Sequence, residues 1–163
     1  MTGLGMTGLE VTGLATVTGL AAGAGAPILL YSIAIAAFLV YLPYTLTAYG
    51  RVLIAKEMAE PMVMFAQPRS FIEKLPAYAQ RANWAHQNGF ESLILYAPAA
   101  LMAYVTGQNS PAVFWAAIAY LGARLLFSVF YVLNIPPLRS LMFGIGSVSI
   151  GLLYFLSCRA IGW

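Results

Sequence analysis

The chain has 163 residues, of which 61% are hydrophobic and only 8% are charged, and its formal net charge at pH 7 is +3. A soluble domain carries about a quarter charged residues, so this composition excludes a soluble globular protein and predicts one that is integral to a membrane. The eight basic residues are spread along the chain, which argues against nucleic acid as a partner. Cys158 is the single cysteine, which excludes an internal disulfide and matches no metal-ligand spacing.

The first 26 residues form a low-complexity segment that repeats the triplet TGL at Thr2, Thr7, Thr12 and Thr18. The repeat unit is too short for a solenoid, and the segment lacks the Lys and Arg of a signal peptide. Because glycine disfavours a stable helix, we expect residues 1–26 to be a mobile or loosely helical lead-in. A membrane domain is then expected over residues 27–163.

Four apolar segments predict four spanning helices, with both termini on one side of the membrane. They cover residues 27–50, 77–105, 111–132 and 138–157. The first carries no charge and is long enough to cross about 30 Å of hydrocarbon, and Pro27 suits the first turn of its helix. In the fourth, Gly144, Gly146 and Gly151 are expected to allow close contact between helices.

Basic residues predict the orientation of the chain. Residues 51–80 contain three prolines and four basic residues, which predicts a loop outside the hydrocarbon. Arg81 adjoins this loop, and Arg139 lies in the turn at residues 134–140 on the same face, whereas the opposite face has only Arg159. Because cytoplasmic loops carry an excess of Lys and Arg, the first loop and the third turn are predicted to face the cytoplasm.

Polar residues at membrane depth form two stripes with helical spacing. The first stripe consists of Arg81, Trp84, Asn88, Glu91 and Leu95, and the second of Tyr120, Arg124, Phe127, Ser128 and Tyr131. Ionisable groups inside a membrane usually face a bundle interior or a cavity. We therefore expect the stripes to meet, so that Glu91 and Arg124 neutralise each other. A purely structural pair that fixes helix register is the alternative. His86 lies off the stripe and is expected to be a structural hydrogen-bonding residue.

Three motifs together resemble the MAPEG superfamily, the membrane-associated proteins of eicosanoid and glutathione metabolism. They are AHQNGFE at residues 85–91, ARLLFSVFY at 123–131 and PLRS at 137–140; residues 68–88 look most like the bacterial branch. The resemblance covers roughly residues 27–157. It implies an all-α integral membrane four-helix bundle, assembled as a homotrimer among membrane lipids. It also implies that glutathione binds as a co-substrate between neighbouring subunits, toward the cytoplasmic side.

The resemblance assigns roles to individual residues. Asn88 and Glu91 match positions that hold glutathione, with Glu91 as partner of its amino group, and Arg124 and Tyr131 match positions in the same site. Arg139 matches the catalytic arginine that stabilises the thiolate. These residue types suit the functional groups of glutathione, because arginine pairs with carboxylates and a nearby cation favours the thiolate form of a thiol.

The sequence also departs from the family's pattern at Trp84, Ser92 and Phe127. Many members carry an arginine at the position of Trp84, and Arg81, one turn earlier, is the candidate that replaces it. Ser92 stands where the leukotriene enzymes have a tyrosine, and Phe127 stands where other members have a tyrosine or another polar residue.

The resemblance implies a glutathione-dependent transferase or peroxidase that acts on a lipophilic small molecule, either an electrophile or a lipid hydroperoxide. The alternative is a non-catalytic membrane scaffold or accessory subunit that keeps the bundle without the thiol site. The matching residues favour the enzyme, and the three departures favour the scaffold. A small transporter is a third class, but the sequence contains no pair of broken helices that would support it.

Overall fold

The computed structural model describes the backbone of residues 7–162 and the side chains of residues 27–162. This part of the chain is helical and contains no strand. The elements are α1 (Thr7–Ala55), α2 (Pro61–Ala66), a short 3-10 helix η1 (Ile72–Lys74), α3 (Ala77–Val105), α4 (Pro111–Val132) and α5 (Pro136–Ala160).

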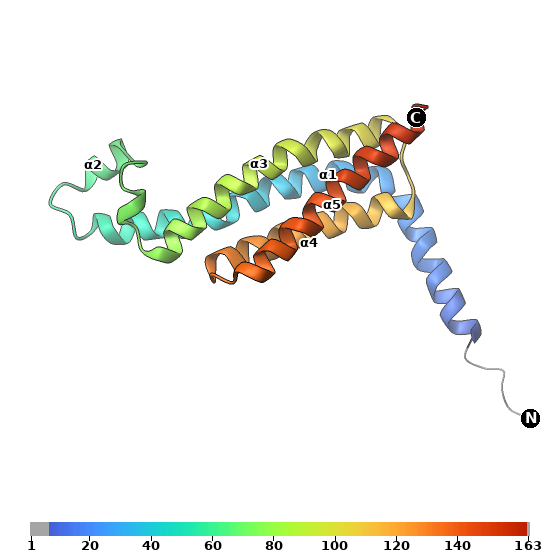
Figure 1. Ribbon diagram of the computed structural model, residues 1–163, viewed down its shortest axis with the longest axis horizontal. Helices are drawn as coiled ribbons and strands as arrows, with labels where there is room; N and C mark the ends of the chain where they lie inside the picture. The colour runs from blue at the N-terminus through green and yellow to red at the C-terminus, as the bar shows by residue number, and fades with distance from the viewer. Residues whose placement is uncertain (1–6, 163) are drawn as a thin grey trace, which may run out of the picture.

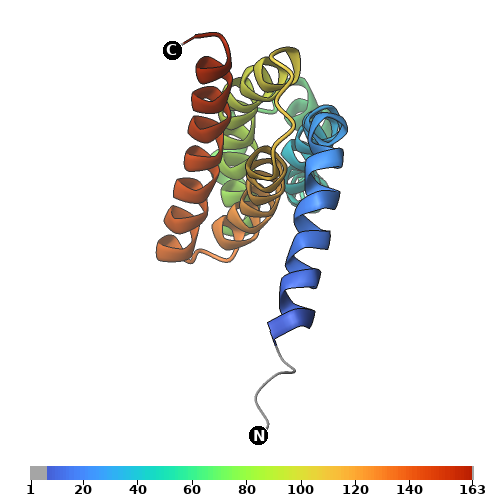
Figure 2. The same cartoon turned by 90° about the vertical axis from the view of Figure 1, so that its right-hand side faces the viewer.

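The four long helices run side by side and alternate in direction, which confirms the predicted all-α four-helix bundle (Figure 1). The loop that carries α2 and η1 lies at the same end of the bundle as the turn between α4 and α5. The α3–α4 turn and the C-terminal end of α5 lie at the opposite end. Seen from that end, α3 and α4 lie between α1 and α5 (Figure 2).

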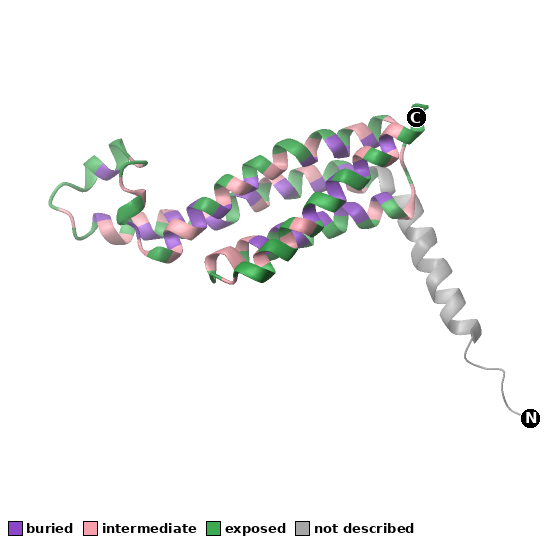
Figure 3. Cartoon of the chain, in the orientation of Figure 1, coloured by how far each residue is buried: buried purple, intermediate pink, exposed green. Residues whose placement is uncertain are grey.

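Three helices are long and apolar enough to cross a membrane, counted over the described residues: the Pro27–Ala55 part of α1, α4 and α5. Helix α3 has 29 residues, but its first half carries several polar and charged side chains. Large apolar side chains cover the outside of the bundle, as the exposed outer faces in Figure 3 indicate; Phe38, Ile94 and Val148 are each about 70% exposed. Such a surface suits hydrocarbon, so the chain is an integral membrane protein.

Two helices differ from the prediction at their N-termini. Helix α1 begins at Thr7, so Pro27 lies inside the helix instead of in its first turn. The many alanines of residues 15–26 favour this extension, because alanine is the best helix former. Helix α5 begins at Pro136 instead of Leu138, because proline is tolerated in a first turn, where its missing N–H has no intrahelical partner.

Two other expectations concern the ends of α1. The TGL triplet at Thr2 lies outside the described residues, whereas from Thr7 onward the lead-in has a helical backbone. At the other end, α1 continues to Ala55 and α3 starts at Ala77. The connection is therefore shorter than the predicted loop over residues 51–80.

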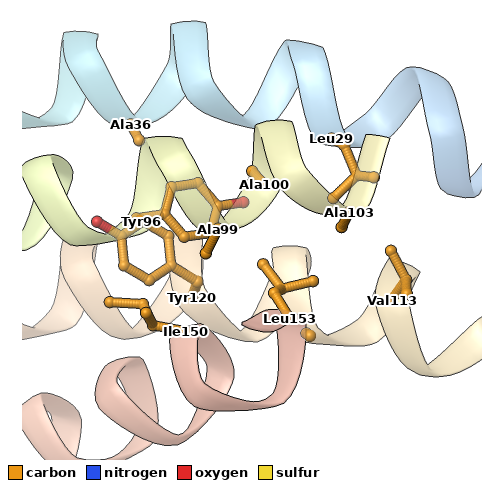
Figure 4. Packing of buried hydrophobic residues seen from close by; sticks show 11 residues of the cluster. Leu29, Ala36, Tyr96, Ala99, Ala100, Ala103, Val113, Tyr120, Ile150 and Leu153 are labelled. Carbon is orange, nitrogen blue, oxygen red and sulfur yellow. The ribbon is translucent and has the colours of Figure 1, made fainter. Parts of the chain in front are cut away.

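Two stacked tyrosines mark the centre of the core. The rings of Tyr96 from α3 and Tyr120 from α4 lie parallel, with centroids 3.6 Å apart, among the small and aliphatic side chains drawn in Figure 4. Tyr96 donates its hydroxyl hydrogen to Ser32 Oγ at 2.6 Å, and the hydroxyls of Tyr120 and Ser92 share a hydrogen bond of 3.1 Å. Both hydroxyls of the tyrosine stack therefore have a partner, as a low-dielectric interior requires.

Glycine allows close helix contact at positions that differ from most of those expected. A Cβ added at Gly50 would lie 2.6 Å from Ala79 Cβ, and one at Gly89 would lie 3.4 Å from a methyl group of Val40. In α5 only Gly146 is close to another helix, whereas Gly144 and Gly151 have open space around them. The tightest approach is therefore between α1 and α3.

Candidate functional site

Three of the predicted site residues line one open cleft of about 280 Å³ at the loop end of the bundle. Asn88 comes from α3, Tyr131 from α4 and Arg139 from α5. Phe127, Ser140 and Phe143 complete its wall, and we call this space the polar cleft. Sequence reasoning did not assign Ser140 or Phe143 to it. Helical spacing from Arg139 could have suggested Phe143, since residues four apart share a face.

Arg139 is held in place by the ring of Tyr131. The guanidinium carbon of Arg139 lies 4.6 Å from the ring centroid of Tyr131, within the range of a cation–π contact. Its backbone N–H bonds the carbonyl of Ile135, which places the residue in the first turn of α5. The free N–H groups of a helix N-terminus add partial positive charge beside this guanidinium. This side of the polar cleft is therefore electropositive.

Arg124 lies behind the polar cleft and is almost completely buried, at 6% exposure. One guanidinium nitrogen, Nη2, donates to the backbone carbonyl of Asn88 at 3.1 Å and approaches Asn88 Oδ1 at 3.4 Å. The guanidinium carbon also lies 4.4 Å from the ring centroid of Phe127. A carbonyl, an amide oxygen and an aromatic face thus surround a cation at membrane depth.

The expected direct ion pair between Glu91 and Arg124 does not form in the described chain. Glu91 is exposed, and its Oε2 accepts a hydrogen bond of 3.2 Å from the Asn88 amide. Asn88 therefore lies between the two charges and bonds both of them. The reason is geometric, because Glu91 is on the outer face of α3 whereas Arg124 points into the bundle.

Arg81 does not line the polar cleft. Its Nε donates to the backbone carbonyl of Val132 at 2.9 Å, where α4 ends. The last carbonyls of a helix have no intrahelical partner, and a cation there also interacts favourably with the helix dipole. Arg81 therefore does not take the place, in this cleft, of the arginine that many family members carry at the position of Trp84. Trp84 itself is 45% exposed on the outer face of α3.

His86 joins α3 to α1, in agreement with the structural role expected for it. Its Nδ1 lies 2.7 Å from the carbonyl oxygen of Val40, a hydrogen bond that requires the proton on Nδ1. Val40 lies in the turn of α1 that precedes Pro43. Rings of Tyr44 and Phe90 pack around the imidazole, with centroids 4.8 and 5.0 Å away.

Two of the departures from the family pattern have clear structural partners. Ser92 shares a hydrogen bond with Tyr120, and Phe127 packs against Arg124 and, edge to face, against Tyr131. Both side chains therefore contribute to packing within the bundle. The polar cleft keeps an amide, a phenol and a guanidinium beside a carboxylate, Glu91, which bonds that amide.

The comparison with known proteins identifies the family of the chain. A family model described as the MAPEG family matches residues 28–159, which is most of the chain and contains every predicted site residue. No curated protein and no solved structure matches the chain. The match confirms the resemblance that the three motifs indicated.

Proposed function

The chain belongs to the MAPEG family, and on that premise we propose that it is a membrane-bound glutathione-dependent transferase or peroxidase. Its substrates would be lipophilic electrophiles or lipid hydroperoxides. The observation that carries the proposal is the convergence of Asn88, Tyr131 and Arg139, from three different helices, on one open cleft.

The chemistry of the cleft matches the chemistry of glutathione, which has two carboxylates, an ammonium group and a thiol. In this proposal Arg139 and the buried Arg124 provide positive potential for carboxylate and thiolate. Glu91 receives the ammonium group, since its second carboxylate oxygen, Oε1, accepts no hydrogen bond from the described side chains. Asn88 and Tyr131 supply neutral polar contacts.

Arg139 would stabilise the thiolate. A thiolate is the reactive nucleophile, and an adjacent cation or helix N-terminus lowers a thiol pKa below its free value of about 8.5. Arg139 combines both features, because it is a cation in the first turn of α5. Tyr131 stacks on the guanidinium and fixes its direction without removing its N–H donors.

A homotrimer is part of the proposal. Glu91 lies ten residues beyond Arg81, which marks the end of α4, so it is about 15 Å deeper along α3. An exposed carboxylate at that depth is unfavourable against lipid. A neighbouring subunit that covers this face of α3 would remove the exposure and close the polar cleft.

We further propose that the α1–α3 loop and the α4–α5 turn face the cytoplasm. The support is that both lie at one end of the bundle, together with the basic residues Arg51, Lys56, Arg69 and Lys74. The polar cleft opens at the same end. A lipophilic substrate would then arrive from the bilayer and glutathione from the cytosol.

The alternative function, a non-catalytic scaffold or accessory subunit, has its own support. Arg81 Nε donates a hydrogen bond to the backbone carbonyl at the end of α4, and Arg124 already donates to oxygen atoms of Asn88. Two of the cations expected to hold glutathione therefore have structural partners. In this reading the charges stabilise the bundle only.

Calorimetric titration of the detergent-solubilised protein with glutathione distinguishes the two functions. The enzyme proposal predicts binding that weakens about tenfold in Glu91→Gln, because a neutral amide cannot balance the ammonium charge. Gln108→Ala, at the opposite end of the bundle, is the matched control and should bind like the wild type. Absence of any binding heat in the folded wild type would favour the scaffold.

A further inference from the structure

An apolar groove separate from the polar cleft runs between α1 and α4. It has a volume of about 380 Å³, within the range of small-molecule sites. We call it the α1–α4 groove, and its walls are Leu42, Pro43, Thr45 and Leu46 of α1 and Leu125, Ser128, Val129, Val132 and Leu133 of α4. It lies on the outside of the bundle, since Leu42, Leu125, Val129 and Leu133 are each 40% exposed or more.

The walls of this groove offer hydrocarbon to a ligand. Its two hydroxyl groups already donate to carbonyls of their own helices, Thr45 to Leu42 at 2.7 Å and Ser128 to Arg124 at 3.1 Å. Nothing polar in the wall therefore needs an outside partner. Within a bilayer, a concave surface of this kind is filled by acyl chains.

A cation contacts the backbone of one residue of the groove wall. Val132 lines the groove, and its carbonyl accepts the hydrogen bond from Arg81 Nε. Neither Nη nitrogen of Arg81 has a hydrogen-bond partner among the described residues, so both are available to an anionic group. Along α4 the groove extends from Leu133 to Leu125, about 12 Å at 1.5 Å per residue. The α1–α4 groove is therefore apolar and ends beside a guanidinium at the end of a spanning helix. A phospholipid has the complementary arrangement, because its apolar acyl chain is joined to an anionic phosphate.

We propose that the α1–α4 groove binds one acyl chain of a bilayer phospholipid and that Arg81 holds its phosphate. A second copy of this chain is a weaker candidate for the same surface. A subunit interface is needed where a charged group would otherwise be exposed to lipid. In this bundle the exposed charge is Glu91, on a face of α3. The proposal gives Arg81 a function that is independent of the polar cleft.

The test uses the full chain in nanodiscs of phosphatidylcholine and phosphatidylglycerol, released into mild detergent for native mass spectrometry. The wild type should retain one phospholipid per subunit. Val129→Phe fills the groove and should lower the retained fraction roughly tenfold, and Leu46→Phe, from the opposite wall, should do the same. Leu126→Phe, at an exposed position of α4 that does not line the groove, is the matched control and should retain lipid.

A second comparison tests the role of Arg81. In nanodiscs to which diacylglycerol is added, Arg81→Gln should lower retention of phospholipid but leave that of diacylglycerol, which has no phosphate, unchanged. Circular dichroism and the subunit count in the same spectra show whether each variant is folded and assembled. Lipid retention equal to the wild type in folded Val129→Phe and Leu46→Phe would overturn the proposal. A second result would also overturn it: a wild type that retains no lipid, together with a change of subunit count in Val129→Phe and Leu46→Phe. That result would mean that a second copy of the chain occupies the groove.

Discussion

Arg124 and Asn88 form a buried polar link between α4 and α3: Arg124 Nη2 lies 3.1 Å from the Asn88 backbone oxygen and 3.4 Å from its side-chain oxygen. The amide of Asn88 in turn donates to Glu91 at 3.2 Å. We predict that Asn88→Ala lowers stability by about 0.5–1.5 kcal/mol, because the backbone acceptor remains when the side chain is lost.

Double-mutant cycles with Arg124→Gln, Asn88→Ala and Glu91→Gln check this order of contacts. Measured by unfolding in detergent, the coupling of Asn88 to each charge should exceed the coupling between the two charges. A Glu91–Arg124 coupling larger than both others would mean that the charges meet directly.

The Tyr96–Ser32 hydrogen bond predicts an asymmetry between two conservative substitutions. Tyr96→Phe leaves Ser32 bonded to the Leu29 carbonyl at 2.8 Å, so its cost should be about 0.5–1.5 kcal/mol. Ser32→Ala leaves the buried Tyr96 hydroxyl without its acceptor, which costs about 1–3 kcal/mol. The apparent melting temperature should therefore fall further in Ser32→Ala. Equal shifts, or a larger one in Tyr96→Phe, would contradict this account of the core.

The close approach of α1 and α3 predicts opposite results for two glycine-to-alanine changes. At Gly50 a new Cβ would lie 2.6 Å from Ala79 Cβ, which cannot rotate away, so the helices must separate. Overpacking of this kind costs about 1–3 kcal/mol. At Gly151 the Cβ has open space, and alanine should stabilise the helix by up to about 1 kcal/mol. Thermal unfolding of the two variants should shift in opposite directions, and a stabilised Gly50→Ala would show that the contact is looser.

Tyr131 allows the stacking of Arg139 to be separated from the chemistry of the phenol. Tyr131→Phe keeps the ring under the guanidinium, whereas Tyr131→Leu removes it. If stacking positions Arg139, Tyr131→Leu should turn over a model electrophile more slowly. The loss of transition-state stabilisation should be about 0.5–2 kcal/mol, the free energy of a cation–π contact. Tyr131→Phe should keep most of its kcat and show any loss mainly in glutathione binding. An equal fall of kcat in both variants would assign the effect to the hydroxyl.

Much of the fold follows from local sequence signals. Pro76 and the polar turn at residues 107–110 predict the two ends of α3, and Pro111 predicts the start of α4, in agreement with the structure. For residues 1–26 the glycines of the TGL triplets allowed a mobile or a loosely helical lead-in, and the backbone from Thr7 onward is helical and continuous with α1.

The site could be predicted only in part, because spacing along a helix fixes a face but not a partner. It grouped Asn88 with Glu91, and Tyr131 with Arg124. It could not show that Asn88 separates the two charges, since that depends on how far α3 is rotated against α4. Nor could it show that Arg81 reaches the last turn of α4, because Val132 lies 51 residues away in sequence.

The central claim is that Arg139 stabilises a bound thiolate, and thiolate absorbance in the ultraviolet tests it most directly. Glutathione is added to the wild type, Arg139→Lys and Arg139→Ala over a range of pH, with oligomeric state and melting temperature checked for each. The account predicts an apparent thiol pKa below the free value of about 8.5 in the wild type, an intermediate one in Arg139→Lys and a value near the free one in Arg139→Ala. Each unit of this difference corresponds to about 1.4 kcal/mol. A wild type that binds glutathione but shows the same thiol pKa as folded Arg139→Ala would contradict the claim.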